Sequence, residues 1–410
     1  MGKIPITHSG IAAMPHDARK AIINTITADL PNRAFLRYLT LFKRLPARDA
    51  WIERLGELDS PVNWAPLMTS VGRTLGNQSQ EATDCQWVSL LFRITSGQLQ
   101  LPTDELNRQI AEYPYFGDQR GVRPSIRAGE VTFADKNVEG GWSESFWEEC
   151  LDETACQLPN VVFETSQTQA KPVVENETVD RMAEYLVQHS RLCLHTSKVD
   201  AKLDTVFGVA LYCLNILREI IGHHANSAVL ARIGLRSVLE GYVTLAYLVK
   251  RNDPALWKSY RVYGAGQGKL AFLKIDESSE RPAHVSIETL RAIANEDQWE
   301  EFLSIDIGHW GKSNLRSMSE IAGVKADYDQ YYIWPSAFAH SQWGAVRTTV
   351  FATCLNPLHR LHRIPLMHAR KLDDVIPDVT RILDKILGLV GDCYPSFEKR
   401  LIAAIDAESN

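Results

Sequence analysis

Charged side chains recur at four-residue spacing in an otherwise apolar segment, and they are the first groups in this chain that could do chemistry. Arg232, Arg236 and Glu240 follow one another in SAVLARIGLRSVLEGYVTLAYLVK, residues 227–250. Residues four apart lie on one stripe of an α-helix. Because apolar residues occur on nearly all sides of this helix, we expect it to be buried, and buried charges are costly unless paired. The stripe therefore either forms a structural ion pair or lines a polar site.

A second polar stripe is predicted in YYIWPSAFAHSQWGAVRTTVF, where Pro335 suits the first turn of a helix. One face of that helix would carry Ser336, His340, Trp343 and Arg347. A hydroxyl and an imidazole placed in this way can share hydrogen bonds and a ligand. Tyr332, just before the helix, could add a phenolic group.

Each of these groups also has a purely structural interpretation. A lone histidine on a helix is usually a hydrogen-bonded structural residue, a buried arginine–glutamate pair can serve packing, and Trp343 and Tyr332 suit a core. The functional interpretation rests on co-occurrence: if the two helices face each other, Glu240 could orient His340 or Arg236, and Arg236 could hold an anion. The candidate catalytic residues are Arg236, Glu240, Ser336 and His340. The candidate ligand-binding residues are Arg232, Lys312, Tyr332 and Arg347.

The composition is that of a globular protein of two or three domains. The chain has 410 residues, is 45% hydrophobic and 23% charged, and carries a formal net charge of -6. It lacks the overall basic excess typical of nucleic-acid binders. A local basic groove is still compatible with this net charge. Charges interrupt the most apolar windows, near 206–217 and 229–249, and the N-terminus lacks an apolar signal core. We therefore expect no membrane contact and a cytoplasmic location.

Cysteine usage argues against disulfides and against a metal site. The seven cysteines are scattered, odd in number and without a CxxC pair, a pattern typical of reduced thiols. His359, His362 and His368 lie in the basic segment PLHRLHRIPLMHARK. That segment either contacts phosphate or RNA or is a solvated connector, and a connector is favoured. We predict neither a metal nor a cofactor.

Hydrophobic periodicity predicts a mainly α fold in two domains. Residues 1–170 are expected to be mostly helical, apart from an irregular Gly/Pro/Arg-rich segment at 113–171. That segment would hold a short strand at 130–133 and a short helix capped by Ser143, with Phe146 and Trp147 packing inward. The polar residues 166–176 suit a linker. Residues 177–410 are expected to be a helical bundle, with helices near 178–195, 199–221, 227–250, 254–274, 286–303, 314–322, 335–354 and 372–393.

The second domain resembles an uncharacterised bacterial all-helical family related to the HEPN group. The matching parts are RSVLEGYVTLAYL (236–248), WGKSNLRSMSEIAGV (310–324) and YDQYYIWPSAFAHS (328–341). The resemblance implies a helical bundle, homodimerisation, and association with toxins and antiviral defence. Many HEPN proteins are metal-independent ribonucleases whose R-x(4–6)-H signature places an arginine on the scissile phosphate and a histidine near the transferred proton. The clearest such match here, Arg363–His368, contains the helix-breaking Pro365, so the Arg236/His340 set is the better candidate.

Three hypotheses follow. The first is an endoribonuclease or toxin in which His340 transfers protons during 2′-OH attack, Arg236 stabilises the phosphate, and Glu240 and Ser336 orient them. Its first domain would sense a trigger or bind a partner protein. The alternative is a non-catalytic helical homodimer that recognises a nucleic acid, nucleotide or protein. In the third hypothesis, the same side chains only stabilise the fold through buried hydrogen bonds and ion pairs.

Overall fold

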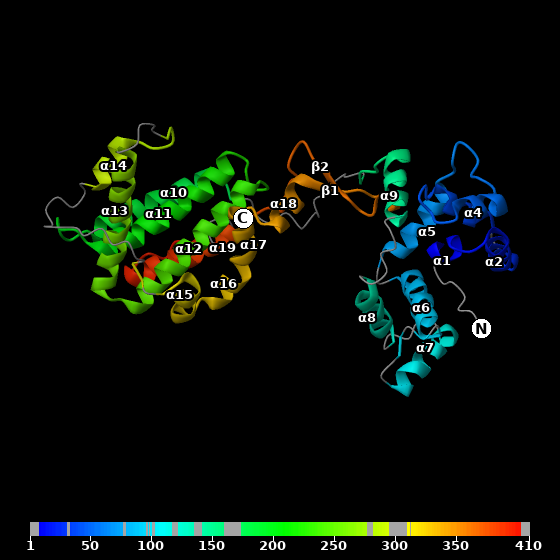
Figure 1. Ribbon diagram of the computed structural model, residues 1–410. Coiled ribbons are helices and arrows are strands. Elements are labelled where there is room, and N and C mark those ends of the chain that lie inside the picture. Colours follow the sequence, from blue (N-terminus) through cyan, green and yellow to red (C-terminus); the bar gives the residue numbers. More distant parts are fainter. Residues whose placement is uncertain are drawn as a thin grey trace, which may run out of the picture. The chain divides into compact units, whose positions relative to one another are not determined.

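The chain folds into helices with little sheet, as its periodicity predicts. The computed structural model describes residues 8–30, 33–76, 79–95, 97, 99–100, 103–116, 122–134, 142–159, 174–276, 282–294, 310–311 and 313–402. Within these residues the structure is mainly α, with one two-stranded antiparallel sheet (Figure 1). It divides into two compact units: Met1–Val162 with Phe351–Pro365, and Phe163–Val350 with Leu366–Asn410. The first unit thus includes a late segment, unlike the continuous first domain expected from sequence.

The first unit consists of short helices and a hairpin. Its helices are α1 (His8–Ala12), α2 (His16–Ala28), α3 (Arg33–Leu36), the 3₁₀ helix η1 (Arg37–Leu41), α4 (Arg48–Leu55), α5 (Ala65–Leu75), α6 (Gln80–Thr95), α7 (Asp104–Phe116), α8 (Arg123–Ala134) and α9 (Trp142–Glu153). The hairpin consists of β1 (Phe351–Thr353), the 3₁₀ helix η2 (Pro357–His359) and β2 (Arg363–Pro365).

The strand predicted at 130–133 is wrong, because α8 covers residues 123–134 of the segment expected to be irregular. Residues 117–121, 135–141 and 160–171 of that segment lie outside the described residues. Pro124 is the second residue of α8, where a missing N–H costs no hydrogen bond. Val122 and Ile126, four residues apart, are buried beside Leu90 of α6. Tertiary packing on that face outweighs the low helix propensity of this composition. The short helix is confirmed as α9, with Phe146 buried, but it begins at Trp142, so Ser143 lies inside the helix and is not its cap.

The hairpin packs within the first unit through its connecting turn. Phe351 pairs with Pro365 and Thr353 with Arg363 in the antiparallel register. Leu358 of η2 is fully buried with Phe146 of α9 and Leu67 of α5. A late stretch of chain is therefore part of the core of the first unit.

The second unit is a helical bundle. Its helices are α10 (Asn176–Cys193), α11 (Ala201–Gly222), α12 (Val229–Arg251), α13 (Pro254–Asp276), α14 (Ile287–Ala294), α15 (Leu315–Ala322), α16 (Lys325–Tyr331), α17 (Ile333–Ala339), α18 (Trp343–Val350) and α19 (Ile376–Cys393). Most begin and end within a few residues of the predicted bounds. In Figure 1, α19, in red, runs beside α12, although the two are far apart in the sequence.

The centre of this bundle is formed by α11, α12 and α19. Leu214, Leu239 and Leu383 are almost entirely buried in its core. Helix α11 extends over Arg218 and Glu219 to Gly222, close to the predicted end at 221. Among the described helices it alone is long and apolar enough to cross a membrane. Half of its most apolar stretch is buried inside the unit, which is also typical of a core helix.

The glycine-rich stretch 263–270 lies inside α13 and forms no phosphate-binding loop. A Cβ at Gly268 would come within 2.6 Å of Ile293 Cγ2, so this glycine permits the close approach of α14.

Candidate functional site

The charged stripe of α12 divides into a buried part and an accessible part. Arg232 is only 7% exposed. Its guanidinium donates to the carbonyls of Asn226 at 3.2 Å, Ala228 at 3.3 Å and Asp373. Burial lowers the pKa of Arg232, and the charges of Asp373 and Asp374 oppose that effect. These bonds join the start of α12 to the segment before α19, which favours a structural role for Arg232.

Arg236, one turn further along, is the centre of a polar cluster. Its Nε donates to Glu240 Oε1 at 2.8 Å, its Nη1 lies 2.9 Å from His340 Nε2, and its Nη2 lies 3.5 Å from the Tyr332 hydroxyl. Its side chain is 17% exposed and that of Glu240 39% exposed. The two stripes therefore meet within one chain, on a face that a ligand can reach.

The helix expected at 335–354 is interrupted at His340. Helix α17 ends at Ala339, Ser341 has a φ of 49°, and α18 begins at Trp343. His340 is the C-cap residue of α17, with φ −107° and ψ 12°. The turn presents the exposed imidazole to Arg236 on α12, against which α17 packs.

This interruption separates the members of the second stripe. Ser336 is half-buried in α17, and its carbonyl accepts from His340 N at 3.2 Å. Trp343 and Arg347 lie on α18, beyond the turn, so a single face through all four residues is wrong. Trp343 is 60% exposed, contrary to the core position expected for it. Lys312 lies outside the described residues. Arg363 of the R-x-x-x-x-H match is in β2, not in a helix.

The contact with Arg236 determines which ring nitrogen of His340 carries the proton. A guanidinium has donors only, so His340 Nε2 must accept in this contact, which requires the tautomer with the proton on Nδ1. Burial lowers the pKa of Arg236, but the hydrogen bond and charge of Glu240, together with Tyr332, outweigh burial and raise it. The cluster thus holds a permanent cation next to a basic ring nitrogen.

Aromatic side chains form one wall of the cluster. The rings of Tyr328 and Tyr332 stack with centroids 4.6 Å apart and planes inclined by 19°, and the Arg236 guanidinium lies 5.4 Å from the Tyr332 ring centroid. Burial, and then the neighbouring Tyr332, raise the pKa of Tyr328, so Tyr328 is a neutral ring at pH 7. Stacked rings beside a cation suit an unpaired base next to its phosphate.

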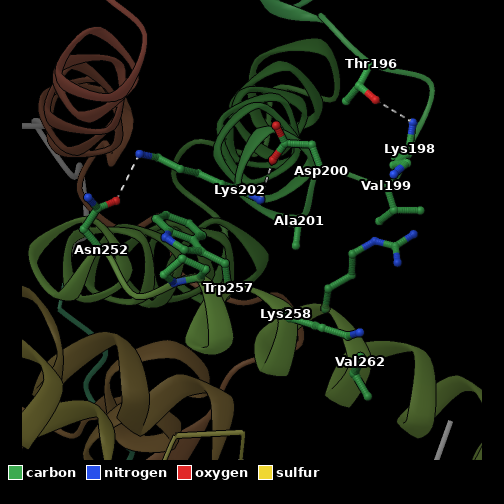
Figure 2. A pocket seen from close by; sticks show the side chains of 12 residues that line it. Thr196, Lys198, Val199, Asp200, Ala201, Lys202, Asn252, Trp257, Lys258 and Val262 are labelled. Carbon is green, nitrogen blue, oxygen red and sulfur yellow. Dashed lines mark hydrogen bonds between the residues drawn. The ribbon is translucent and has the colours of Figure 1, made fainter. Parts of the chain in front are cut away.

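A cavity lies elsewhere in the second unit. It measures about 640 Å³ and lies between the segment before α11 and the start of α13 (Figure 2). Its lining includes Lys198, Lys202, Lys258 and Arg261. Lys202 Nζ donates to Asn252 Oδ1 at 3.0 Å, and Arg261 Nε lies 3.3 Å from Asp204 Oδ2. No sequence motif indicates this basic pocket, because its cations come from separate segments.

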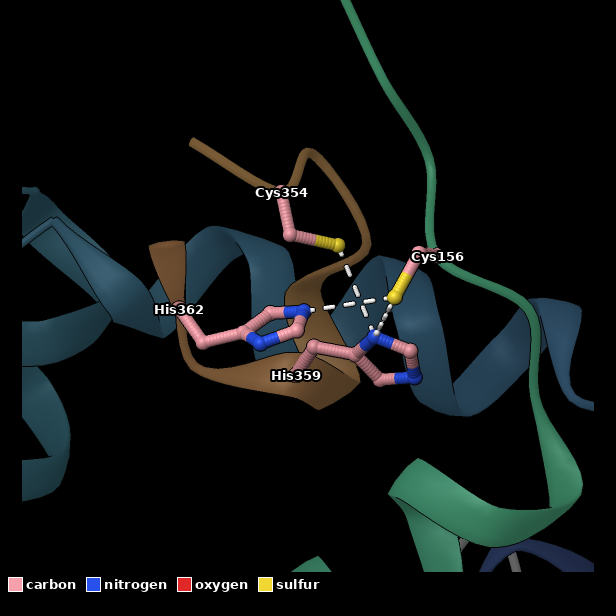
Figure 3. A group of neighbouring side chains, drawn as sticks. All are labelled: Cys156, Cys354, His359 and His362. Carbon is pink, nitrogen blue, oxygen red and sulfur yellow. Dashed lines mark hydrogen bonds between the residues drawn. The ribbon is translucent and has the colours of Figure 1, made fainter. Parts of the chain in front are cut away.

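Two cysteines and two histidines converge in the first unit, which local spacing did not predict. The ligand atoms of Cys156, Cys354, His359 and His362 all lie within 4.8 Å of one another (Figure 3). Cys156 follows α9, whereas the other three belong to the hairpin. In the sequence, only the close spacing of Cys354, His359 and His362 hinted at this cluster, and its fourth member is far away.

Comparison with known proteins gives one family match. Residues 204–352 match the model of a family of unknown function (DUF5677). Neither the curated proteins nor the solved structures give a match to the chain. The matched range includes Arg236, Glu240, Tyr332 and His340. All four members of the Cys/His cluster lie outside the matched range.

Proposed function

We propose that the second unit is a HEPN-like, metal-independent endoribonuclease whose site is the Arg236 cluster. The observation on which this proposal rests is the contact between Arg236 and His340 on an accessible face, next to the stacked tyrosines. The proposal includes RNA as substrate, a cytoplasmic homodimer, and a toxin or antiviral defence role in which the first unit senses a trigger or binds a partner protein.

The geometry of Arg236 suits a phosphate. Glu240 engages Nε, so the fork formed by Nη1 and Nη2 faces His340 and Tyr332. An RNA phosphate would replace both contacts and bind the fork in a bidentate way, which frees the lone pair of His340 Nε2. The unpaired base beside that phosphate would stack on Tyr332 and Tyr328.

The proposed reaction is transesterification within RNA. His340 Nε2 accepts the 2′-hydroxyl proton as the 2′-oxygen forms a bond to phosphorus, and the bond from phosphorus to the 5′-oxygen breaks. The leaving 5′-oxygen takes up a proton from water, and the products are a 2′,3′-cyclic phosphate and a 5′-hydroxyl. Arg236 stabilises the charge on the phosphoryl oxygens, and Glu240 holds Arg236 in place. Ser336, one turn before His340, would support the position of the ring through its backbone contact.

The test is cleavage of fluorescently labelled single-stranded RNA by the full-length protein without added divalent metal. We expect His340→Ala and Arg236→Ala to lower the cleavage rate by about 100-fold or more, since proton transfer and charge stabilisation each contribute at least that much. His368→Ala, which removes another exposed histidine of the second unit, is the control and should cleave like wild type. RNA lacking 2′-hydroxyls should remain intact.

The same variants would be compared in cells for growth arrest and total RNA integrity at matched soluble levels. Fragmentation that disappears in both site variants supports the ribonuclease. Intact RNA with wild-type protein, both in vitro and in cells, would contradict it.

The basic pocket favours a second candidate, a non-catalytic module that binds an anionic ligand such as a nucleotide. Lys198 and Lys202 lie beside the start of α11, near Lys258 and Arg261 of α13. This hypothesis predicts that Lys198→Glu weakens binding of a labelled nucleotide or RNA at least tenfold, and that His340→Ala leaves binding unchanged. Equal binding by wild type and Lys198→Glu would contradict it.

A further inference from the structure

The Cys/His cluster of the first unit has the spacing of a metal site. Cys156 Sγ lies 3.5 Å from His359 Nδ1 and 3.3 Å from His362 Nε2, and Cys354 Sγ lies 3.5 Å from His359 Nδ1. A tetrahedral zinc ion with bonds of about 2.3 Å to sulfur and about 2.0 Å to nitrogen has sulfur–nitrogen edges of about 3.5 Å. The four donor atoms already surround a point that such an ion would occupy (Figure 3).

The hydrogen bonds around His359 leave the correct nitrogen free to bind a metal. The Thr154 hydroxyl donates its only proton to Cys150 O at 2.5 Å, and its oxygen accepts from Asn356 Nδ2 at 3.0 Å. His359 Nε2, 2.9 Å from the same oxygen, must therefore be the donor. The lone pair then lies on Nδ1, which faces both sulfurs. A ligand histidine whose other nitrogen donates to a protein oxygen is the usual arrangement in zinc sites.

Hydrogen bonds that involve none of the four cysteine and histidine side chains hold the two contributing segments together. Leu355 N donates to Gln157 O at 2.7 Å, and Asn356 Nδ2 donates to Ala155 O at 3.0 Å. Within the hairpin, Cys354 N donates to His362 O at 2.9 Å. The Cys156 segment and the hairpin are thereby positioned before any ion binds.

We propose that Cys156, Cys354, His359 and His362 form a structural zinc site that joins the hairpin to the segment after α9. Two thiolates balance the charge of a divalent ion, and sulfur with imidazole selects zinc over magnesium or calcium. Four protein ligands complete the tetrahedron and leave no open position for a substrate, which is the pattern of a structural site. The ion holds the hairpin in place, and the hairpin lies between α18 and α19 in the sequence.

Metal analysis of the full-length protein, purified without chelators, tests the site directly. We expect about one zinc ion per chain by plasma mass spectrometry, since the site has one complete ligand set. Cys354→Ser and His359→Ala should each reduce the zinc content at least tenfold. Cys85→Ser and His368→Ala, which replace exposed residues of the same types outside the cluster, should keep it.

Two measurements keep the test decisive if a ligand variant does not fold. The first is cobalt(II) titration of metal-stripped wild-type protein, which should give the visible bands of a tetrahedral ion with thiolate ligands. The second uses Thr154→Val, which retains every ligand but removes the hydroxyl that positions His359. It should weaken zinc affinity by about 10- to 100-fold, and Thr154→Ser should restore it.

Three results would overturn the proposal. They are a folded wild-type protein that neither contains nor takes up zinc, unchanged zinc content in Cys354→Ser and His359→Ala, and a disulfide between Cys156 and Cys354 in non-reducing peptide mapping. Because the site lies in the first unit, its metal content is measured independently of RNA cleavage by the second.

Discussion

Two arginines one helical turn apart differ because their partners and exposure differ. Arg232 is buried and donates to three backbone carbonyls, of which that of Asn226 also accepts from Val375 N. Among the described residues, the hydrogen bonds of Arg236 go to side chains, one of them the half-exposed Glu240. The same residue type on the same stripe is therefore structural at one position and available to a ligand at the next.

Replacement of each arginine by methionine should separate these roles. We expect Arg232→Met to lower the free energy of unfolding by about 2–3 kcal/mol, because the charge-assisted hydrogen bonds that join the start of α12 to the segment before α19 are lost. Arg236→Met should cost about 1 kcal/mol or less, since a partly exposed ion pair contributes little. Urea unfolding of the full-length protein followed by circular dichroism measures both. Equal losses of unfolding free energy in the two variants would indicate that Arg236 also has a structural role.

At the scale of elements, close helix packing positions the site. Glu240 is followed by Gly241, where a Cβ would lie 2.9 Å from Cys213 Sγ and 3.4 Å from Val209 Cγ1 of α11. The absence of a side chain lets α12 approach α11 on one side while its opposite face carries Arg236 toward α17. A glycine in mid-helix, normally unfavourable, is here required by packing.

Gly241→Val should therefore destabilise the second unit by about 1–3 kcal/mol through overpacking. Gly208→Ala is the matched control, because Gly208 is also inside a helix but has no atom within 4 Å of an added Cβ. It should stabilise the protein by about 0.5–1 kcal/mol. Thermal unfolding of both variants gives the comparison. A Gly241→Val variant as stable as wild type would show that α11 and α12 can separate without cost.

At the scale of the whole molecule, the second unit keeps titratable groups neutral by burying them. Burial raises the pKa of Cys213 to about 12. Burial, followed by Asp327, raises that of Tyr242 to about 12. In the unfolded chain these groups titrate near their ordinary values of 9.0 and 10.0. Between those values and pH 12 the native state binds more protons than the unfolded state.

The free energy of unfolding should thus be unaffected by these groups below pH 9 and should fall as the pH rises from 9 toward 12. Each group contributes a slope of up to about 1.4 kcal/mol per pH unit within its own window. Urea unfolding at a series of alkaline pH values measures the slope. Cys213→Ala removes one titrating group and should flatten the curve by that amount. An identical slope in wild type and Cys213→Ala would exclude this thiol as a cause.

The sequence by itself determined the features that depend on near neighbours. Apolar periodicity predicted the helices of the second unit, and four-residue spacing placed Arg236 and Glu240 on one stripe, because helix geometry is local. The tertiary structure alone decided the helical state of 123–134, the turn that presents His340, and the meeting of Cys156 with the hairpin. Each of these depends on contacts between segments that are distant in the chain. Such contacts leave no periodic signal, since the free energy that favours them comes from packing between elements and not from local propensity.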